Sequence, residues 1–446
     1  MFERFTQRLF QPVDALPLNL FRVAFALVLM LQFFVYSSAH FVEAGIIAPR
    51  FLFTYDYLPF LKPLPLGGMK FVLYCTFIGP AMMLFRKTLR YGVVLFLLSF
   101  AYLLFLEESY YNNHFYMFLM LCSFWLFVSP KRDASGTDVI PYWQLFLFQF
   151  LVVLVYFYGG LVKINHDWLI LQQPPRELLS MNAPGSWLAS NAAVYYITYG
   201  GILFDLFIGF LLLNRRTFLV AAIVSILFHA TNHFIFNMGD GGTIGVFPFA
   251  MIAANLLFAE GAGIRKFLAR FGLENLGRKT LPLKKGESET ILFPQNALVK
   301  NLLFTFLIIQ LLLPFRYLLV SQSNVDWYGQ ANSFSWRMKV YTKEVSVKFY
   351  ARKQQNDPLT PINIGRIINT MQINMMAQNA DMIYKFSMYL KKELHKEWGI
   401  DPIITADIQV GMNGRPKQAF VDPNTNLAAI TYSPWSKPDW VLPMKD

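Results

Sequence analysis

Nine apolar runs constrain the fold of this 446-residue chain more than any other feature of its sequence. An α-helix needs about 20 apolar residues to cross the hydrocarbon core of a bilayer. The runs occupy residues 18–36, 67–85, 91–106, 115–128, 142–161, 196–213, 218–236, 243–257 and 302–319. Only 15% of the residues are charged, whereas soluble domains average about 25%. The sequence therefore predicts a polytopic α-helical membrane protein with about nine transmembrane helices.

Basic residues orient these predicted helices, because short cytoplasmic loops carry an excess of Lys and Arg. With the N-terminus in the cytoplasm, 17 basic residues lie in inside segments and 4 in outside loops. Eight of the 17 fall in the 260–300 loop, which we expect on the cytoplasmic face. The tail after the ninth helix then lies in a bacterial periplasm or in the lumen of the endoplasmic reticulum. The net charge of +12 reflects this orientation, and no nucleic-acid partner is expected.

The tail, residues 321–446, has the composition of a water-exposed domain. Alternating residues predict strands at 345–350 and 408–414, and helical spacing with a charged face predicts a helix over 381–398. We therefore expect two domains. Residues 1–320 form a helical membrane domain that holds the active-site pocket, and residues 321–446 form a mixed, β-rich extracytoplasmic domain.

Polar side chains gather at the predicted outer ends of three apolar runs. Asn113 and His114 open the fourth run, Lys163 closes the fifth, and His229 and Asn232 lie toward the end of the seventh. Ionisable groups inside a membrane cost several kcal/mol unless they face a cavity or a partner. The pattern predicts one shared pocket that opens to the outer side.

Less specific interpretations remain for each of these residues. Lys163 could extend its ammonium to the interface, as lysines near helix ends do, and His114 and His229 could simply hydrogen-bond between helices. Arg22 and Asp205, which lie within runs, are expected to be structural and to pair with other buried polar groups.

A metal site has little support. His229 and His233 are spaced i, i+4, but no Glu follows the first histidine as in HExxH, and no third ligand is evident. Phosphate-binding glycine motifs are absent as well. We expect neither a metal nor nucleotide-driven chemistry.

Three segments of the membrane part resemble vitamin K-dependent γ-glutamyl carboxylases. Residues 156–168, YFYGGLVKINHDW, closely resemble the family segment YFxAGxxKLxxDW. Residues 112–114 match its NNH motif, and residues 228–239 are similar to its FHxxNxxxFxxG stretch. The resemblance implies that Lys163 is the catalytic base and that His114 and Asn113 act beside it. It also implies that His229 and Asn232 contact the cofactor.

The resemblance continues through the tail. Residues 324–329 and 335–338, NVDWYG and SWRM, resemble the family's NNWTNG…SWDMM region, associated with glutamate and vitamin K binding. This implies that Trp336 and Met338 contact the cofactor, and that Trp327 and Tyr328 contact the substrate. The segments at 420–423, 433–435 and 440–443 are similar to its FDP…WSPF…WVxP end. Because the matches keep their order along nearly the whole chain, it is identified as a member of this family, with an HTTM-type membrane domain.

Several departures point to a bacterial-type member. Tyr317 stands where animal carboxylases have the histidine of LPYSHFL, and no cysteine follows Cys122 to form their bridge between the two parts. Animal enzymes also continue beyond the WVxP segment. These differences suggest menaquinol as the hydroquinone.

The resemblance implies an activity. A reduced vitamin K, phylloquinol or menaquinol, is oxidised by O₂ to its epoxide, and this generates the base that removes the γ-proton of a peptide glutamate. The carbanion then adds CO₂ to give γ-carboxyglutamate. The expected partners are a glutamate-containing protein or peptide, membrane lipid and the quinone pool. Two alternatives are a hydroquinone epoxidase without carboxylation and a non-enzymatic quinone- or lipid-binding protein of the same fold.

Overall fold

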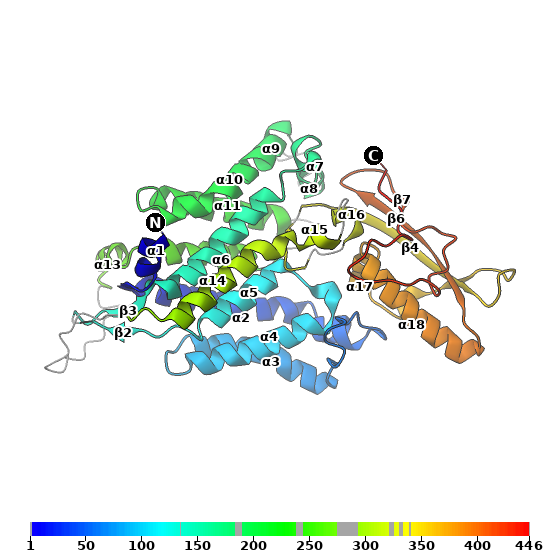
Figure 1. Ribbon diagram of the computed structural model, residues 1–446, viewed down its shortest axis with the longest axis horizontal. Coiled ribbons are helices and arrows are strands. Elements are labelled where there is room, and N and C mark those ends of the chain that lie inside the picture. Colours follow the sequence, from blue (N-terminus) through cyan, green and yellow to red (C-terminus); the bar gives the residue numbers. More distant parts are fainter. Residues whose placement is uncertain are drawn as a thin grey trace.

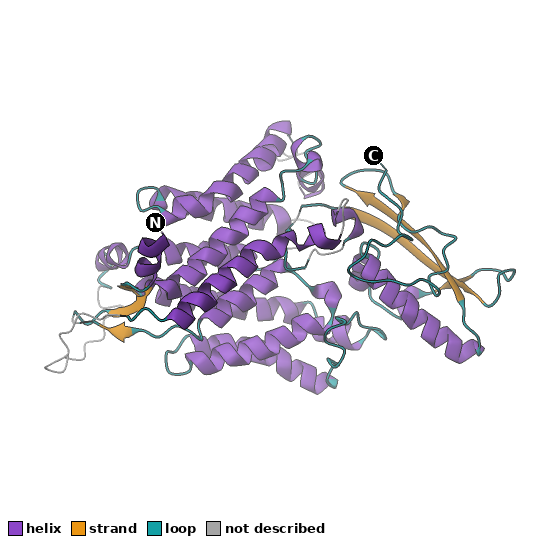
Figure 2. Ribbon diagram, viewed as in Figure 1, coloured by secondary structure: helices purple, strands orange, loops and turns teal. Residues whose placement is uncertain are grey.

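The computed structural model of the chain describes residues 2–133, 135–182, 190–237, 244–273, 293–320, 325–329, 333–338 and 340–445. A large helical part and a smaller part that carries a sheet lie end to end (Figures 1 and 2). We call them the helical domain and the C-terminal domain. The predicted fold class, a polytopic helical protein with a C-terminal domain that contains a sheet, is confirmed.

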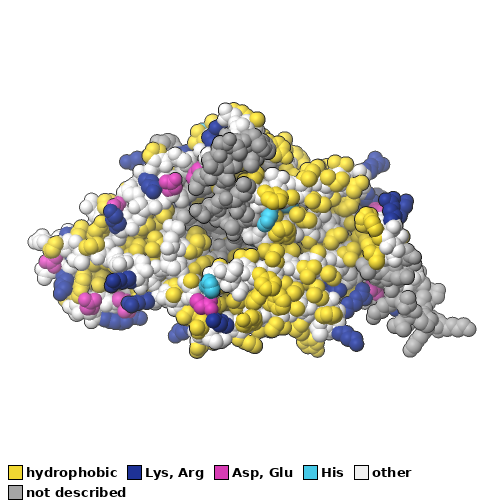
Figure 3. Space-filling model, turned by 180° about the vertical axis from the view of Figure 1, so that it is seen from behind, with side chains coloured by type: hydrophobic (Ala, Val, Ile, Leu, Met, Phe, Trp, Pro, Cys, Tyr) yellow, Lys and Arg dark blue, Asp and Glu magenta, His cyan; other side chains and the backbone are white. Residues whose placement is uncertain are grey.

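Within the described residues, seven helices are long and apolar enough to cross a membrane. They are α2 (Leu16–Ser38), α3 (Leu66–Met83), α4 (Leu89–Leu106), α6 (Tyr142–Leu161), the continuous run of α9 and α10 (Asn191–Leu213), α11 (Phe218–Asn237) and the run of α14 and α15 (Ala297–Leu319). Apolar side chains cover the face of the helical domain in Figure 3, and charged side chains gather toward the two ends of the molecule. A multi-pass membrane protein follows from these helices.

Two of the nine predicted helices are shorter than expected. The 115–128 run forms α5 (Asn113–Phe124), whose 12 residues extend only about 18 Å. Met117, Phe118 and Leu121 are fully buried in the centre of the domain, so α5 is a core helix rather than a lipid-facing one. The 243–257 run forms α12 (Phe247–Ala254) and the turn η5 (Asn255–Phe258), which bend by 102° into α13 (Gly261–Ala269). The described residues contain an eighth candidate span only if this bent pair of helices is counted as a single span.

Short elements complete the helical domain. Helix α1 (Phe2–Leu9) precedes strand β1 (Pro12–Asp14), which pairs with β3 (Asp138–Pro141), and β3 also pairs with β2 (Lys131–Arg132). This small sheet lies at the end farthest from the C-terminal domain (Figure 1). Helices α7 (His166–Leu169) and α8 (Pro175–Asn182) lie at the opposite end, beside the C-terminal domain. Residues 274–292, in the middle of the 260–300 loop, lie outside the described residues.

The crossing of α6 and α10 (Gly201–Leu213) depends on small residues. A Cβ at Gly160 would lie 2.9 Å from the backbone nitrogen of Leu206, and one at Gly209 would lie 3.1 Å from the Cα of Val153. Small residues at helix interfaces let two backbones approach closely in a membrane. The close crossing sets the distance between the side chains that α6 and α10 direct toward each other.

Arg22 has the structural role expected of it. The side chain is buried in α2, and its Nη1 donates a hydrogen bond of 2.5 Å to the carbonyl of Met83, at the end of α3. A helix C-terminus carries partial negative charge on its free carbonyls, so it is a suitable partner for a buried guanidinium.

The C-terminal domain is a four-stranded antiparallel sheet packed on helices. The strand order is β5 (Thr360–Ile362), β4 (Lys343–Arg352), β6 (Ile403–Met412) and β7 (Gln418–Ala419). Helix α18 (Ala380–Trp398) covers one face, with the ring of Phe386 5.3 Å from that of Phe349. The predicted strands and helix of the tail are confirmed. Helices α16 (Val325–Tyr328) and α17 (Thr370–Met376) complete the domain.

A loop of the helical domain enters the C-terminal domain, which the sequence did not predict. Phe53 follows α2 in the chain, yet its side chain is fully buried in the core of the C-terminal domain. Glu107 accepts hydrogen bonds from the Phe53 amide at 2.8 Å and from the Gln372 side chain at 3.0 Å. Burial raises the pKa of Glu107 to about 7. The two domains therefore share buried polar and apolar contacts and not only a covalent link.

We predict that Gly160→Ala destabilises the protein, because its methyl group must displace the backbone of α10. Overpacking of this kind costs about 1–3 kcal/mol, so the melting temperature of the purified protein in detergent should fall by several degrees. Gly201→Ala is the matched control, because a Cβ there meets nothing within 4 Å. Equal melting temperatures for the two variants would contradict the close crossing.

Candidate active site

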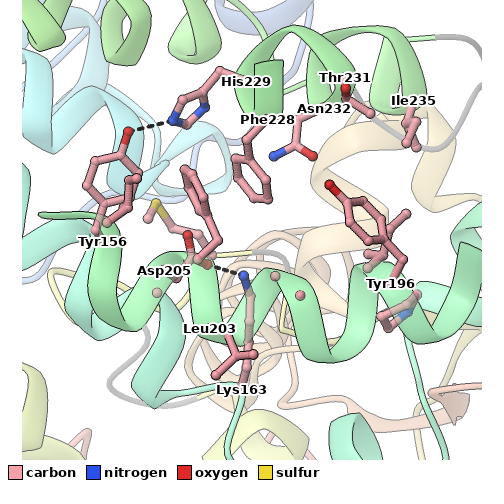
Figure 4. A pocket seen from close by; sticks show the side chains of 18 of the residues that line it. Tyr156, Lys163, Tyr196, Leu203, Asp205, Phe228, His229, Thr231, Asn232 and Ile235 are labelled. Atoms are coloured by element: carbon pink, nitrogen blue, oxygen red, sulfur yellow. Dashed lines mark hydrogen bonds and ion pairs between the residues drawn. The ribbon is translucent and has the colours of Figure 1, made fainter. Parts of the chain in front are cut away.

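A cavity of about 810 Å³ lies among α6, α10, α11 and α12. Its wall is mainly aromatic and aliphatic, and the polar groups that line it include His114, Tyr156, Lys163, Asp205, His229 and Asn232. Figure 4 shows side chains of α6, α10 and α11 that converge on this space. Large apolar cavities with a few convergent polar groups are the usual form of small-molecule sites.

The cavity reaches the exposed apolar surface of the helical domain. Leu203 and Phe207 on α10 and Leu227 on α11 line it, and each is more than half exposed. Exposed leucine and phenylalanine side chains on spanning helices face lipid. A lipid-soluble molecule could therefore enter from the side, between α10 and α11.

Lys163 and Asp205 form an ion pair inside the cavity. Lys163 follows the last turn of α6, where its amide donates to the carbonyl of Gly160. Only 13% of the Lys163 side chain and 10% of the Asp205 side chain are exposed. The ammonium lies 5.1 Å from the centre of the Trp168 ring. Lys163 therefore points into the cavity and not toward solvent (Figure 4).

A second polar centre in the same cavity is built on Tyr156. Its hydroxyl lies 2.7 Å from Nε2 of His229 and 3.2 Å from Oγ of Ser225. Tyr156 comes from α6, seven residues before Lys163 and on the same face of the helix, and Ser225 and His229 come from α11. His229 is only 3% exposed, so its side chain lies at the cavity wall and not at the protein surface.

His114 reaches the cavity from the first turn of α5. Its ring stacks on that of Phe247, with centroids 3.8 Å apart. Asn112 caps α5, since its side chain accepts a hydrogen bond from the His114 amide. Met338, which follows α16 in the chain, also lines the cavity. The structure thus brings together five residues that the sequence singled out: His114, Lys163, His229, Asn232 and Met338.

Asn113 and Trp336 lie beside the cavity but are not part of its wall. The Asn113 amide donates to the carbonyl of Arg337 at 3.2 Å, and its oxygen accepts from the Tyr111 hydroxyl at 3.1 Å. Trp336 is fully buried against Tyr116, with ring centroids 5.2 Å apart. Both therefore hold the segment that carries Met338, and direct contact with a bound molecule stays a prediction.

Trp327 and Tyr328 are placed away from the cavity. Both are buried in the core of the C-terminal domain, and the Trp327 indole donates to the carbonyl of Leu442 at 2.8 Å. Contact with a glutamate substrate would require this core to open. Their assignment to substrate binding stays a prediction that this arrangement does not support.

Two members of the site were not chosen from the sequence. Asp205 was expected to be structural, and Tyr156 was not considered. One signal was available for Asp205: an unpaired carboxylate in an apolar helix requires a cation at similar depth, and Lys163 supplies one. A signal was also present for Tyr156, which is the first residue of the family-like segment 156–168 and lies seven residues before Lys163.

Metal-ligating side chains do not converge here. Among the described residues, no group of three or more His, Cys, Asp or Glu side chains could hold a metal ion. His233 lies against the ring of Phe249, with centroids 4.7 Å apart.

Comparison with protein families accounts for nearly the whole chain. Residues 10–262 match the HTTM domain, and residues 295–446 match the lumenal domain of vitamin K-dependent gamma-carboxylase. The chain belongs to the vitamin K-dependent γ-carboxylase family. No solved structure matches it. The resemblance drawn from its sequence motifs is confirmed.

In this carboxylase-family protein, the segment that carries Lys163 is tied directly to the lumenal-type C-terminal domain. Asp167 accepts two hydrogen bonds of 2.7 Å from the Arg415 guanidinium and a third of 2.7 Å from the Asn413 amide. Burial opposes ionisation of Asp167, but these donors outweigh it and hold the pKa of the carboxyl below its ordinary value. The link is therefore complete at neutral pH and is lost as the pH falls through that lowered pKa.

We predict that Arg415→Met loosens the end of α6 from the C-terminal domain. Hydrogen bonds to charged groups contribute about 1.5–3 kcal/mol each, so amide exchange across residues 163–169 should become faster and the melting temperature should fall. Lys417→Met is the control, because Lys417 is a half-exposed cation whose partner Glu344 is 3.7 Å away. Unchanged exchange in Arg415→Met would contradict a rigid link.

Proposed function

We propose that this protein is an integral-membrane carboxylase that couples the epoxidation of reduced vitamin K by O₂ to the carboxylation of peptide glutamate. One observation carries the proposal. This member of the family has a large apolar cavity that is open toward lipid, and the cavity contains a buried lysine at the position of the family's catalytic base.

The described residues fit a hydroquinone with an isoprenoid side chain. Such a molecule has an apolar ring, two oxygens on opposite sides of it, and a long apolar tail. The Lys163–Asp205 pair and the Tyr156–His229 pair provide two polar centres in one apolar cavity. The tail would leave between Leu203 and Leu227, on the lipid-facing side of α10 and α11.

The bound hydroquinone supplies, together with O₂, a base strong enough to remove the γ-proton of glutamate, which no side chain can do at neutral pH. Lys163 would accept the proton of one hydroquinone hydroxyl. His229 and Asn232 would hydrogen-bond ring oxygens, and His114 would orient the ring from its stack on Phe247. The aromatic wall excludes water, which would otherwise quench the reactive species.

We also propose the orientation that the loop charges predict. The N-terminus lies in the cytoplasm, and the C-terminal domain lies in the periplasm or lumen. The quinone pool of the membrane, as phylloquinol or menaquinol, supplies the cofactor, while glutamate-containing protein arrives from the side of the C-terminal domain. Lys163 lies at the end of α6 that is tied to this domain through Asp167.

A second candidate is hydroquinone epoxidation without carboxylation. It is favoured by the burial of Trp327 and Tyr328, the two residues expected to hold glutamate. A non-enzymatic quinone-binding protein is less consistent with the site, because binding alone does not require an ion pair buried in an apolar cavity.

The turnover prediction separates these possibilities. Purified protein in lipid vesicles, given reduced vitamin K, O₂, labelled bicarbonate and a glutamate peptide, should produce both epoxide and labelled peptide. Epoxide without label would identify the epoxidase. Neither product from folded protein would leave only the binding protein and would refute the proposed function.

Lys163→Ala should abolish both products. Loss of a general base typically costs about 10²–10⁴-fold in rate. Because the variant leaves Asp205 without its cation, its melting temperature is measured beside turnover to show that the protein is folded. Lys70→Ala removes a half-exposed lysine paired with Glu43 on another part of the helical domain and should leave turnover unchanged. Full activity of Lys163→Ala would exclude a role for Lys163 as the base.

A further inference from the structure

The ion pair of Lys163 poses a chemical problem for its role as a base. A lysine ammonium has three donors and no lone pair, so it cannot accept a proton. A neighbouring carboxylate favours this charged form, and Asp205 contacts Lys163 directly. Lys163 can therefore act as a base only if its own ammonium proton has somewhere to go.

Within the described wall of the cavity, Asp205 is the only carboxyl group. The other titratable groups that line it are His114 on α5, Tyr156 on α6, Tyr196 before α10, and His229 on α11. His229 shares its Nε2 with the Tyr156 hydroxyl. Beside α7, Asp167 is fully engaged by Arg415 and Asn413. Among these described residues, only Asp205 both contacts Lys163 and has a site for an added proton.

The fold holds the carboxylate in this position. Asp205 precedes Leu206, whose backbone nitrogen is the atom that a side chain at position 160 would strike. Gly160 lies three residues before Lys163, so this close approach of α6 and α10 is adjacent to the ion pair. The pair is thus set by two packed helix backbones and not by two flexible surface chains.

We propose that Asp205 is a positioning residue that receives the proton of Lys163, so that the two side chains act as one acid–base unit. The inference rests on the proposed function. As the hydroquinone O–H bond breaks, its proton forms an N–H bond on Lys163, and an N–H proton of the ammonium passes to a carboxylate oxygen of Asp205. The products are the hydroquinone monoanion, the Lys163 ammonium and neutral Asp205. No electrons are transferred, and one proton moves to the pair.

The unit also explains why an ion pair lies in an apolar cavity. Two groups that share a proton titrate together, and their pH dependence belongs to the pair rather than to either group. The developing hydroquinone anion remains beside the Lys163 ammonium, which stabilises it electrostatically in a water-poor site. A lone neutral lysine could also accept the proton. Only the ion pair, however, has no net charge before the reaction and still provides an ammonium beside the hydroquinone.

The first test uses binding without turnover. Wild-type protein is mixed with reduced vitamin K in the absence of O₂, and the infrared difference spectrum is recorded. The carbonyl band of a protonated carboxylic acid should appear on binding, and it should shift when isotope-labelled aspartate is incorporated. The band should be missing in Asp205→Asn and present in Asp138→Asn, which removes a carboxylate paired with Arg86 at the distant end of the helical domain.

The second test is the pH dependence of epoxide formation. In Asp205→Asn the lysine amine is the only remaining acceptor, so the acid-side limb of the pH–rate profile should move to higher pH. The rate near neutral pH should fall by at least about tenfold. Asp205→Glu should restore most of the rate and the original limb, and Asp138→Asn should match the wild type.

A purely structural role gives a different result. If the pair only clamps α6 to α10, Asp205→Asn lowers the melting temperature and leaves the pH–rate profile in place, which overturns the inference. Hydroquinone bound to the wild type without a protonated-carboxyl band overturns it as well, even if Asp205→Asn fails to fold. Absence of hydroquinone binding to the wild type overturns the proposed function itself, and the inference with it.

Discussion

A charged side chain inside an apolar helical bundle must be paired, and the site depends on how this chain satisfies that requirement. Lys163 and Asp205 come from different helices, so their contact requires α6 and α10 to approach closely. Gly160 and Gly209 permit this approach because neither has a Cβ to hold the backbones apart. The pairing of the lysine with its carboxylate is a consequence of this helix crossing.

The second organising feature is the connection between the two domains. Asp167 lies four residues after Lys163 and is held by Arg415 and Asn413 of the C-terminal domain. At a second contact between the domains, the Phe53 side chain enters the core of the C-terminal domain. Glu107 accepts hydrogen bonds there from the Phe53 amide and from the Gln372 side chain. The segment that follows α6 is thus in direct contact with the C-terminal domain.

Strained backbone marks the segment 333–338, which packs against the start of α5. Phe334 and Trp336 have φ values of 59° and 56°, which cost bulky residues of order 1–3 kcal/mol each. Hydrogen bonds and ring contacts from Tyr111 and Tyr116 hold them there. The same segment carries Met338, which lines the cavity.

The sequence by itself determined the membrane class, the family, and five residues that meet in the cavity. Hydropathy identifies helices because the bilayer requires long apolar stretches, and motifs identify Lys163 and His114 because their neighbours in the chain are distinctive. It also indicated the strands of β4 and β6 and the helix α18, since those patterns are local. Two of its nine apolar runs form shorter helices than expected, because a buried core helix such as α5 is as apolar as one that faces lipid.

Only the tertiary structure decided which polar groups meet. The partnership of Lys163 with Asp205, the hydrogen bond between Tyr156 and His229, and the burial of Trp327 and Tyr328 depend on packing between segments far apart in the chain. Periodicity specifies which face of a helix is apolar but not which neighbour that face will contact. The physical reason is that the shapes of the contacting side chains determine how two helices cross, here Gly160 against Leu206. The sequence of one helix does not reveal which other helix it will contact.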